Sequence, residues 1–378
     1  MAPRDAHFMR LAVQLGRKGL GRTSPNPPVG AVVVAGGRIV GRGYHHGPGK
    51  FHGEIEALRD AGARARGATL YVSLEPCNHH GRTPPCTEAI LTAGVRRVVF
   101  GVRDPNPHVR GGGAARLRRR GVAVDSGIEA HACAELIAGF LTVARLRRPL
   151  VALKLAGTLD GRIATASGAS RWITGEPARR YAHGLRNEYD AVMVGAGTVI
   201  ADDPALTCRI RGGRDPLRVI VDGRLRVPLT AQVLRAGAAP GTLLATTVER
   251  GAKLATLRRR GITVLAQPGR GGVLSLRRLL SRLAARGVTS VLIEGGAGLA
   301  AAALRARVVD RLFLFVAPKL IGGDGIPLVG PLGVRGMRDT LGVRVLGASR
   351  VGADLLLRGV VEYRKKTGTG TGTGTGRV

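Results

Sequence analysis

The sequence predicts an α/β fold made of two domains. Helical and strand patterns alternate along the first half of the chain, which is typical of a layered α/β domain. The 378 residues exceed what one ordinary hydrophobic core organises. A short basic stretch that ends in proline, residues 145–149, precedes a second series of strand patterns. We therefore expect one domain over residues 1–146 and another over residues 147–365.

The first domain is expected to begin with a helix and a β-hairpin. Apolar residues stand at helical spacing between positions 8 and 15. Residues 31–35 and 38–44 are predicted as strands, because the intervening Gly36-Gly37 is a turn dipeptide suited to a hairpin. Further elements follow in alternation: helices at 54–66, 87–93 and 130–144, and strands at 68–74 and 95–101.

The second domain is expected to begin with a strand at 150–155. Its further strands are predicted at 191–195, 217–221, 243–246, 262–266, 290–293 and 311–316, with helices at 176–187 and 274–285 and two strand-like runs within 342–363. Residues 367–376 are a strict Thr-Gly alternation with nothing to bury. We expect residues 366–378 to form a disordered tail.

The charge balance is strongly basic, with a formal net charge of +34. Such an excess raises nucleic acid as a partner. Here the charge is almost all arginine and is scattered through every segment, and aromatic residues that would stack on bases make up only 3%. We therefore favour a solvated surface without nucleic-acid binding, whose positive field also suits a phosphorylated small substrate.

Cysteine use and the N-terminus indicate a cytoplasmic protein. Four cysteines in a chain of this length do not make a disulfide framework, so a reducing compartment is expected. The N-terminus lacks the pattern of a signal peptide, and no apolar run is long enough to span a bilayer. The sequence leaves open whether the protein forms a homo-oligomer.

A zinc site is predicted by His52-Gly53-Glu54 and, further on, Pro76-Cys77 and Cys86. One imidazole and two thiolates would hold Zn²⁺ and leave a fourth position open for water, as in catalytic zinc sites. Glu54 stands two residues from a ligand, where a carboxylate can carry protons between that water and a leaving amine. The pattern therefore predicts hydrolytic deamination.

The spacing of the two cysteines departs from the short P-C-x-x-C signature, because eight residues (78–85) separate them. Two prolines stiffen this segment, and Cys86 opens a predicted helix whose N-terminal dipole favours a thiolate. The alternatives are a disulfide, small buried cysteines, or a core histidine at position 52. They leave Glu54 unexplained. Cys133 and Cys208 carry no such pattern and are expected to have no role.

The segment from Cys77 to Cys86, which reads C-N-H-H-G-R-T-P-P-C, resembles the pyrimidine deaminase of riboflavin biosynthesis. Residues 154–161, 170–175, 194–204 and 294–298 follow in the order found in the reductase half of the bifunctional riboflavin-biosynthesis deaminase-reductase. The resemblance covers nearly all of the chain except the tail. It implies a cytidine-deaminase-like three-layer domain followed by a dihydrofolate-reductase-like domain.

The resemblance also implies two activities with the cofactors Zn²⁺ and NADPH. The first half would hydrolyse 2,5-diamino-6-ribosylamino-4(3H)-pyrimidinone 5′-phosphate to the corresponding uracil. The second half would then reduce the ribosyl group to ribityl with NADPH. The product would be 5-amino-6-ribitylamino-uracil 5′-phosphate.

Site residues follow from the resemblance position by position. It implies His52, Cys77 and Cys86 as zinc ligands and Glu54 as the proton shuttle. Implied substrate contacts are Asn26, His80, Arg82, Ser170, Arg186, Arg209 and Glu294. Implied NADPH contacts are Ala156, Trp172, Thr198, Asp202, Gly296, Ala297 and Gly298. Lys154 and Asp160 match the family pattern without a definite role.

Two other functions remain as alternatives at this stage. A nucleic-acid base deaminase with an unrelated appended domain would bind RNA strongly and in a salt-sensitive way. A structural zinc module would unfold on chelation and turn over no aminopyrimidine. In so arginine-rich a chain, Arg186 and Arg209 are also consistent with ordinary surface charges.

Overall fold

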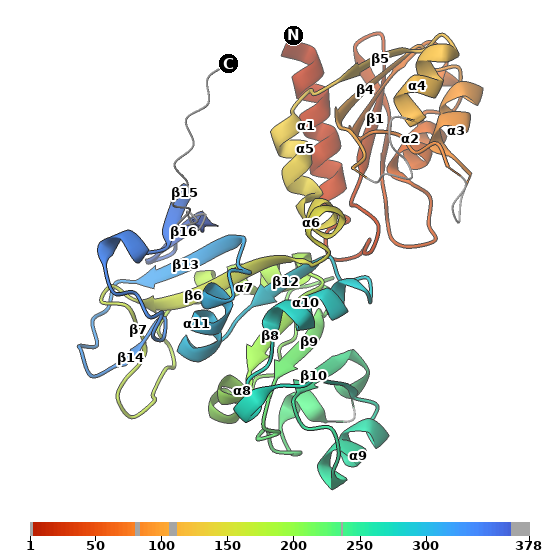
Figure 1. Ribbon diagram of the computed structural model, residues 1–378. Helices are drawn as coiled ribbons and strands as arrows, with labels where there is room; N and C mark the ends of the chain where they lie inside the picture. The colour runs from red at the N-terminus through yellow and green to blue at the C-terminus, as the bar shows by residue number, and fades with distance from the viewer. Residues whose placement is uncertain (1–2, 80–83, 106–111, 236, 364–378) are drawn as a thin grey trace, which may run out of the picture.

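Two separate β-sheets organise the chain, one in each half (Figure 1). The computed structural model describes residues 3–79, 84–105, 112–235 and 237–363. The tail predicted at residues 366–378 lies outside these ranges, and so do His80 and Arg82. Among the described residues, no helix is both long and apolar enough to cross a membrane.

The first sheet has five strands in the order β2-β1-β3-β4-β5. They are β1 (Gly30–Ala35), β2 (Arg38–Tyr44), β3 (Thr69–Leu74), β4 (Arg97–Val102) and β5 (Ala123–Ser126). β1 runs antiparallel to both neighbours, whereas β3, β4 and β5 are parallel. The central strands are almost fully buried, because helices cover both faces of the sheet.

The helices of the first half form the outer layers. They are α1 (Pro3–Arg17), α2 (Gly53–Ala61), α3 (Cys86–Thr92), α4 (Gly112–Arg119), α5 (Ala130–Leu136) and α6 (Ala138–Leu146), with a 3-10 turn at Gly62–Ala65. α1 and α5 lie on one side of the sheet, and α2, α3 and α4 lie on the other (Figure 1). The first half is thus a three-layer α/β unit.

Helix α2 approaches strand β2 unusually closely, because β2 carries glycine at two positions that face the helix. A Cβ atom on Gly41 would lie 2.2 Å from the Ala57 carbonyl oxygen, and one on Gly43 would lie 2.3 Å from the Ala57 nitrogen. Any side chain at either position would push the helix away from the sheet. The backbone of α2 therefore rests directly on the backbone of β2.

The second sheet has nine strands in the order β11-β10-β9-β8-β12-β6-β13-β16-β15. They are β6 (Leu150–Thr158), β8 (Ala191–Gly195), β9 (Leu217–Val221), β10 (Thr242–Thr246), β11 (Thr263–Ala266), β12 (Ser290–Ile293), β13 (Arg311–Ala317), β15 (Gly342–Val351) and β16 (Asp354–Glu362). The strands from β11 to β13 are parallel, and β16 and β15 complete the sheet as an antiparallel hairpin. A separate two-stranded arm pairs β7 (Arg162–Ala164) with β14 (Ile326–Pro327).

Helices cover both faces of the second sheet as well. They are α7 (Glu176–Glu188), α8 (Ala196–Asp202), α9 (Ala252–Arg259), α10 (Leu276–Ala284) and α11 (Ala297–Arg305), with 3-10 turns at Gln232–Leu234, Ala239–Gly241, Arg270–Gly272 and Met337–Asp339. Leu185 of α7 packs with Ala152 and Leu292 on one face, whereas α10 and α11 pack with Leu153 and Ile293 on the other. This alternation follows from the two-residue period of a strand.

Most predicted elements are present, and the differences have local reasons. The strands at 217–221 and 290–293 have the predicted bounds. The helix predicted at 130–144 is broken into α5 and α6 at Ile137, whose φ of −102° and ψ of 19° are not helical. α4 was not predicted, because it begins with two glycines and ends in arginines, and so lacks an apolar period.

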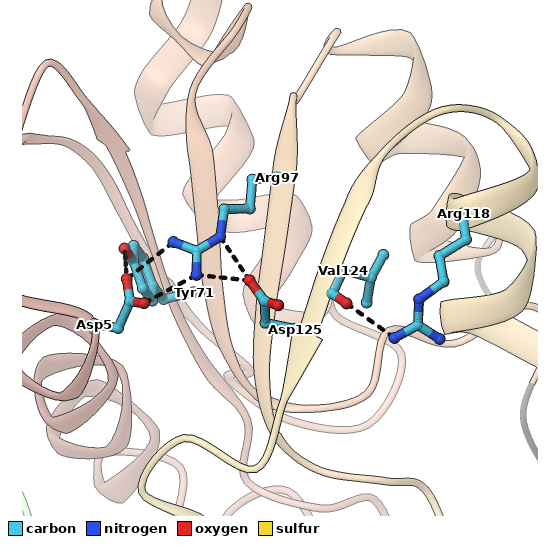
Figure 2. A network of polar contacts seen from close by, with 6 residues as sticks. All are labelled: Asp5, Tyr71, Arg97, Arg118, Val124 and Asp125. Carbon is cyan, nitrogen blue, oxygen red and sulfur yellow. Dashed lines mark hydrogen bonds and ion pairs between the residues drawn. The ribbon is translucent and has the colours of Figure 1, made fainter. Parts of the chain in front are cut away.

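A polar network fixes α1 to strands β3, β4 and β5 of the first sheet (Figure 2). Arg97 of β4 donates hydrogen bonds of 3.0 and 2.9 Å to the two oxygens of Asp5, and the Tyr71 hydroxyl donates one of 2.6 Å to the same carboxylate. Arg97 also reaches Asp125 at 2.6 Å. The Arg97 hydrogen bond is the main cause that lowers the pKa of Asp5 below its ordinary 3.8.

The two halves meet directly after α6. Arg148, in the linking segment, binds both oxygens of Asp310 at 2.7 Å. Arg311 forms an ion pair with Glu135 of the first half. A cavity of about 390 Å³ lies between the two halves and is lined by residues of both, among them Arg17 and Tyr181. The halves are therefore packed together through specific polar contacts.

Candidate active sites

The three predicted zinc ligands converge in the first half. His52 immediately precedes α2, Cys77 follows β3, and Cys86 is the first residue of α3. The Nδ1 atom of His52 lies 3.3 Å from the Cys86 sulfur and 3.6 Å from the Cys77 sulfur. All three ligand atoms lie within 4.8 Å of one another, although Cys86 follows His52 by 34 residues. Both cysteines are free, so the alternative of a disulfide is wrong.

This donor set fits a zinc ion. Zn–N bonds of about 2.0–2.1 Å and Zn–S bonds of about 2.3 Å at tetrahedral angles put nitrogen and sulfur ligands about 3.6 Å apart. The observed separations of 3.3 and 3.6 Å match that geometry. One histidine with two cysteines is also a ligand set typical of catalytic zinc with an open fourth position.

Glu54 lies beside these ligands in the first turn of α2. Its residue is only 3% exposed, and its Oε2 atom is buried without a hydrogen-bond partner in the part of the chain that the structure describes. Burial raises the pKa of Glu54, and the His52 ring partly opposes that shift. A buried carboxyl with a raised pKa holds a proton more readily than an exposed one and is suited to passing it between two groups.

The pKa values of the two cysteines are shifted in opposite directions: the Cys77 sulfur and burial raise the pKa of Cys86, whereas that of Cys77 is lowered. The thiol of Cys86, followed by the His52 ring and the Cys86 backbone N–H, lowers the pKa of Cys77 to about 4 against the effect of burial. That N–H group, at the start of α3, donates to the Cys77 sulfur at 3.4 Å. Cys77 is therefore ready to bind a metal as a thiolate.

Asn26 is held by His45, a residue that the sequence did not single out. The His45 ring is buried, its Nδ1 atom is 2.9 Å from the Phe51 carbonyl oxygen, and its Nε2 atom is 3.1 Å from Asn26 Nδ2. A carbonyl only accepts, so Nδ1 carries the proton. The ring also lies edge-on to His52 at 5.3 Å. A second histidine directly after a strand, seven residues before His52, was the available signal.

Glu75 was also missed, although it stands directly before Pro76-Cys77. Its buried carboxylate accepts hydrogen bonds from the backbone N–H groups of Asp104 at 3.3 Å and Ala114 at 3.0 Å. It therefore fixes the loop that carries Cys77 to two points near β4 and α4. His80 and Arg82, the other predicted contacts here, lie outside the described residues.

In the second half, Arg186 and Glu294 form a buried ion pair. Arg186, at the end of α7, donates from Nε and Nη2 to the two Glu294 oxygens at 2.7 and 2.9 Å, and from Nη1 to the Thr207 carbonyl at 3.0 Å. The side chains are only 15% and 10% exposed. Three of the five guanidinium N–H groups are thus used within the protein. Arg186 therefore has only two guanidinium N–H groups left to donate to a phosphate.

Lys154 of β6 lies next to this pair. Burial lowers the pKa of its ammonium group, and the Glu294 carboxylate partly opposes that shift. Burial alone would raise the pKa of Glu294, but the Arg186 guanidinium and Lys154 lower it. The three side chains form one charged cluster at the carboxyl end of the parallel strands, where ligands bind in open α/β sheets.

The predicted cofactor residues around α11 also come together. Gly296 immediately precedes α11, Ala297 opens it, and Gly298 follows in its first turn. The Gly296 N–H donates to the Thr198 hydroxyl of α8 at 3.1 Å. A Cβ atom added at Gly197 or at Gly298 would meet nothing within 4 Å outside its own helix. A helix N-terminus next to open space suits a phosphate group.

Trp172 and Asp202 lie on a neighbouring loop and helix. Trp172 is 62% exposed, and the Arg179 guanidinium stacks over its ring at 4.3 Å. Arg171 donates to the Asp202 carbonyl at 2.9 Å. An exposed tryptophan held by a cation is a ready surface for a planar ligand.

Asp160 has a definite structural role. It accepts hydrogen bonds from the Thr158 hydroxyl and from the backbone N–H groups of Ile321 and Gly322, at 3.0 and 2.7 Å. The Thr158 hydroxyl, followed by Gly322, lowers the pKa of this carboxyl to about 2. The same loop carries Lys319, which donates to the Trp172 carbonyl at 2.7 Å.

Three further predicted site residues lie in the second half: Ala156, Ser170 and Arg209. Ala156 lies in β6 opposite Phe315 of β13. Arg209 is exposed, and its backbone N–H donates to His183 Nδ1 at 3.3 Å. Ser170 lies in the loop before Trp172. Cys133 is buried in the core of the first half, as expected for a residue without a role in a site.

Comparison with protein families assigns each half separately. Residues 3–102 match the cytidine and deoxycytidylate deaminase zinc-binding region, and residues 149–357 match the RibD C-terminal domain. The predicted α/β fold class, a deaminase-like domain followed by a reductase domain, is confirmed.

Relatives and solved structures match nearly the whole chain. The riboflavin biosynthesis protein RibD of Aquifex aeolicus is 43% identical over 93% of this chain and 97% of its own, and that of Escherichia coli is 40% identical over 93% and 98%. The structure of Acinetobacter baumannii RibD has a TM-score of 0.86 at 38% identity, covering 95% of this chain and 99% of that one. A deaminase/reductase structure from Thermotoga maritima has a TM-score of 0.84 at 37% identity, covering 94% and 98%. The chain therefore belongs to the RibD family of riboflavin biosynthesis proteins.

Proposed function

We propose that the protein catalyses two successive steps of riboflavin biosynthesis. The first is hydrolytic deamination of 2,5-diamino-6-ribosylamino-4(3H)-pyrimidinone 5′-phosphate, assigned to residues 1–146. The second is NADPH-dependent reduction of the ribosyl group to ribityl, assigned to residues 147–365. The convergence of His52, Cys77 and Cys86 beside the buried Glu54 carries the proposal.

In the deaminase site, each residue has a distinct task. His52, Cys77 and Cys86 would hold zinc, which supplies a Lewis acid that activates water. Glu54 takes a proton from the attacking water and delivers it to the nitrogen that leaves as ammonia. The burial of Glu54 keeps that proton from exchanging freely with solvent and raises the pKa of the Glu54 carboxyl. Asn26, held by His45, orients the pyrimidine.

In the reductase site, NADPH supplies the hydride, and the protein aligns the reactants. The start of α11 and Thr198 would hold a phosphate of the cofactor, and the exposed Trp172 would offer it a flat surface. Arg186, kept in place by Glu294, offers its two remaining N–H groups to the substrate. Arg209, whose side chain is exposed, is the better candidate for the substrate phosphate.

We further propose that the substrate is a free phosphorylated pyrimidine and not a base within nucleic acid, and that the protein works in the cytoplasm. A positive charge of +34 favours any phosphate, but only 3% of residues are aromatic. The free state of all four cysteines supports a reducing compartment.

The proposal is tested with purified protein, the diaminopyrimidine ribotide, and NADPH added or withheld. Ammonia should be released in both conditions, because deamination needs no cofactor. NADPH should be oxidised only with substrate present, in step with ribityl product. A protein that releases no ammonia and unfolds on chelation would instead be a structural zinc module.

A further inference from the structure

Residues 21–25 of the first half lie against residues 187–190 of the second half. We call residues 21–25 the docking segment. It ends directly before Asn26, which we assign to the deaminase site, and residues 187–190 begin directly after Arg186, which we assign to the reductase site. One contact between the halves thus lies next to a proposed residue of each site.

Ser24 makes the central contact of the docking segment. Its hydroxyl donates to Asp190 Oδ1 at 2.7 Å and lies 2.9 Å from the Thr289 hydroxyl. The other Asp190 oxygen accepts from the Thr289 N–H, the Thr289 hydroxyl and the Ser290 N–H at 2.7, 2.7 and 2.9 Å. Asp190 is only 8% exposed. Ser24 therefore binds a carboxylate that β12 already holds in one orientation.

Gly21 and Arg22 extend the contact to the end of α7. Gly21 has a φ of +69°, and a Cβ atom there would lie 2.3 Å from the Asn187 carbonyl oxygen. Arg22 Nη2 donates to the Gly212 carbonyl at 3.0 Å and reaches Asn187 Oδ1 at 3.4 Å. Only glycine fits this close approach, so the two backbones are in direct contact.

The contact is continuous with both proposed sites. On one side, the Asn26 N–H donates to the Thr23 carbonyl at 2.9 Å, and the Asn26 side chain is held by His45. On the other side, Asn187 lies in the last turn of α7, directly after Arg186, and Asp190 follows the end of that helix. The docking segment is therefore in contact with groups adjacent to both Asn26 and Arg186.

We propose that Ser24 and Asp190 are positioning residues through which the docking segment holds Asn26 and Arg186 in place together. Loosening this contact weakens substrate binding in both active sites, although neither residue touches a reacting atom. The inference rests on the proposed function, because it assumes that both halves are active.

The test uses the full chain and follows ammonia release and NADPH oxidation separately. Gly21→Ala disrupts the contact by its clash with Asn187, and Gly36→Ala is its matched control. Gly36 also has a positive φ, +55°, but a Cβ atom there meets nothing within 4 Å. Ser24→Ala removes one hydrogen bond without a clash, and Ser281→Ala, on the exposed side of α10, is its control.

Gly21→Ala is expected to raise KM about fivefold or more in both reactions, with kcat changed less than about twofold. Ser24→Ala is expected to raise both KM values in the same direction by less. A purely structural effect would lower the folded fraction, and thus the apparent kcat, with KM unchanged. Unchanged KM values, or a change in only one reaction for both variants, would overturn the proposal. Inactivity of the wild-type chain would instead contradict the proposed function.

Discussion

The Arg186 guanidinium binds both oxygens of the Glu294 carboxylate, at 2.7 and 2.9 Å, in a site where the two side chains are only 15% and 10% exposed. Glu294→Gln leaves the Arg186 charge uncompensated. We expect the free energy of unfolding to fall by about 3–5 kcal/mol and NADPH oxidation to slow. Urea unfolding and the NADPH assay measure the two effects.

The matched control for that variant lies on α7, the helix that carries Arg186. Glu176 and Arg180 form an ion pair in which the side chains are 69% and 72% exposed. Glu176→Gln should change the free energy of unfolding by less than about 0.5 kcal/mol, because solvent screens the pair. Equal effects of the two substitutions would contradict the importance of the buried pair.

Glu54→Gln should reduce the rate of ammonia release by about 10²–10⁴-fold, because glutamine cannot carry the proton between water and the leaving nitrogen. Zinc content, measured by mass spectrometry, should stay at the wild-type level, since Glu54 is not among the predicted ligands. Glu56→Gln, in the same turn of α2, is the control and should remain active. Full deamination by Glu54→Gln would disprove the assigned role.

Removal of the metal should separate the two reactions. A chelator is expected to stop ammonia release while NADPH oxidation continues with saturating uracil substrate, because the predicted ligands all lie in the first half. Cys77→Ser should lose most of its zinc, whereas Cys208→Ser should keep it. Equal loss of both activities on chelation would mean that the metal also supports the second half.

Acid should weaken the contribution of Asp5 to the free energy of unfolding. Because the Arg97 hydrogen bond lowers its folded pKa, the carboxylate stabilises the protein above its unfolded pKa, and this stabilisation is lost as pH falls through the lowered value. We expect the free energy of unfolding of wild type to exceed that of Asp5→Asn by about 1–3 kcal/mol at neutral pH. The difference should shrink below about pH 4.

Urea unfolding across a pH series checks this prediction. Asp125 binds the same guanidinium (Figure 2), but its side chain is 53% exposed. Asp125→Asn should therefore cost less than about 0.5 kcal/mol. If the difference in free energy of unfolding between wild type and Asp5→Asn grew in acid, folding would not lower the pKa of Asp5.

Asp160→Ala should raise the KM for NADPH, because Asp160 anchors the loop whose Lys319 holds the Trp172 carbonyl. Asp324→Ala changes an exposed carboxylate of the same loop and is expected to leave this KM unchanged. Initial rates of NADPH oxidation at varied cofactor concentration provide the measurement. An unchanged KM in Asp160→Ala would remove this loop from the cofactor site.

The sequence predicted what depends on local pattern. The strand at 290–293 was recognised because its run of β-branched and apolar residues stands between turns, and the zinc triad because its ligands have a distinctive spacing. The pair Ser24 and Asp190 gave no signal, since 166 positions separate the two residues and neither belongs to a motif. The hydrogen bonds from the Arg186 guanidinium to Glu294 could likewise not be predicted from the sequence, because they depend on how α7 lies against β12.

The glycines at positions 41 and 43 have a consequence for how this protein tolerates change. Helix α2 contacts main-chain atoms of β2 at these positions, and Ala57, Leu58 and Ala61 of the same helix also pack in the core. A side chain introduced at position 41 or 43 would therefore displace the helix that carries Glu54. The geometry around Glu54 thus requires that positions 41 and 43 stay without a side chain.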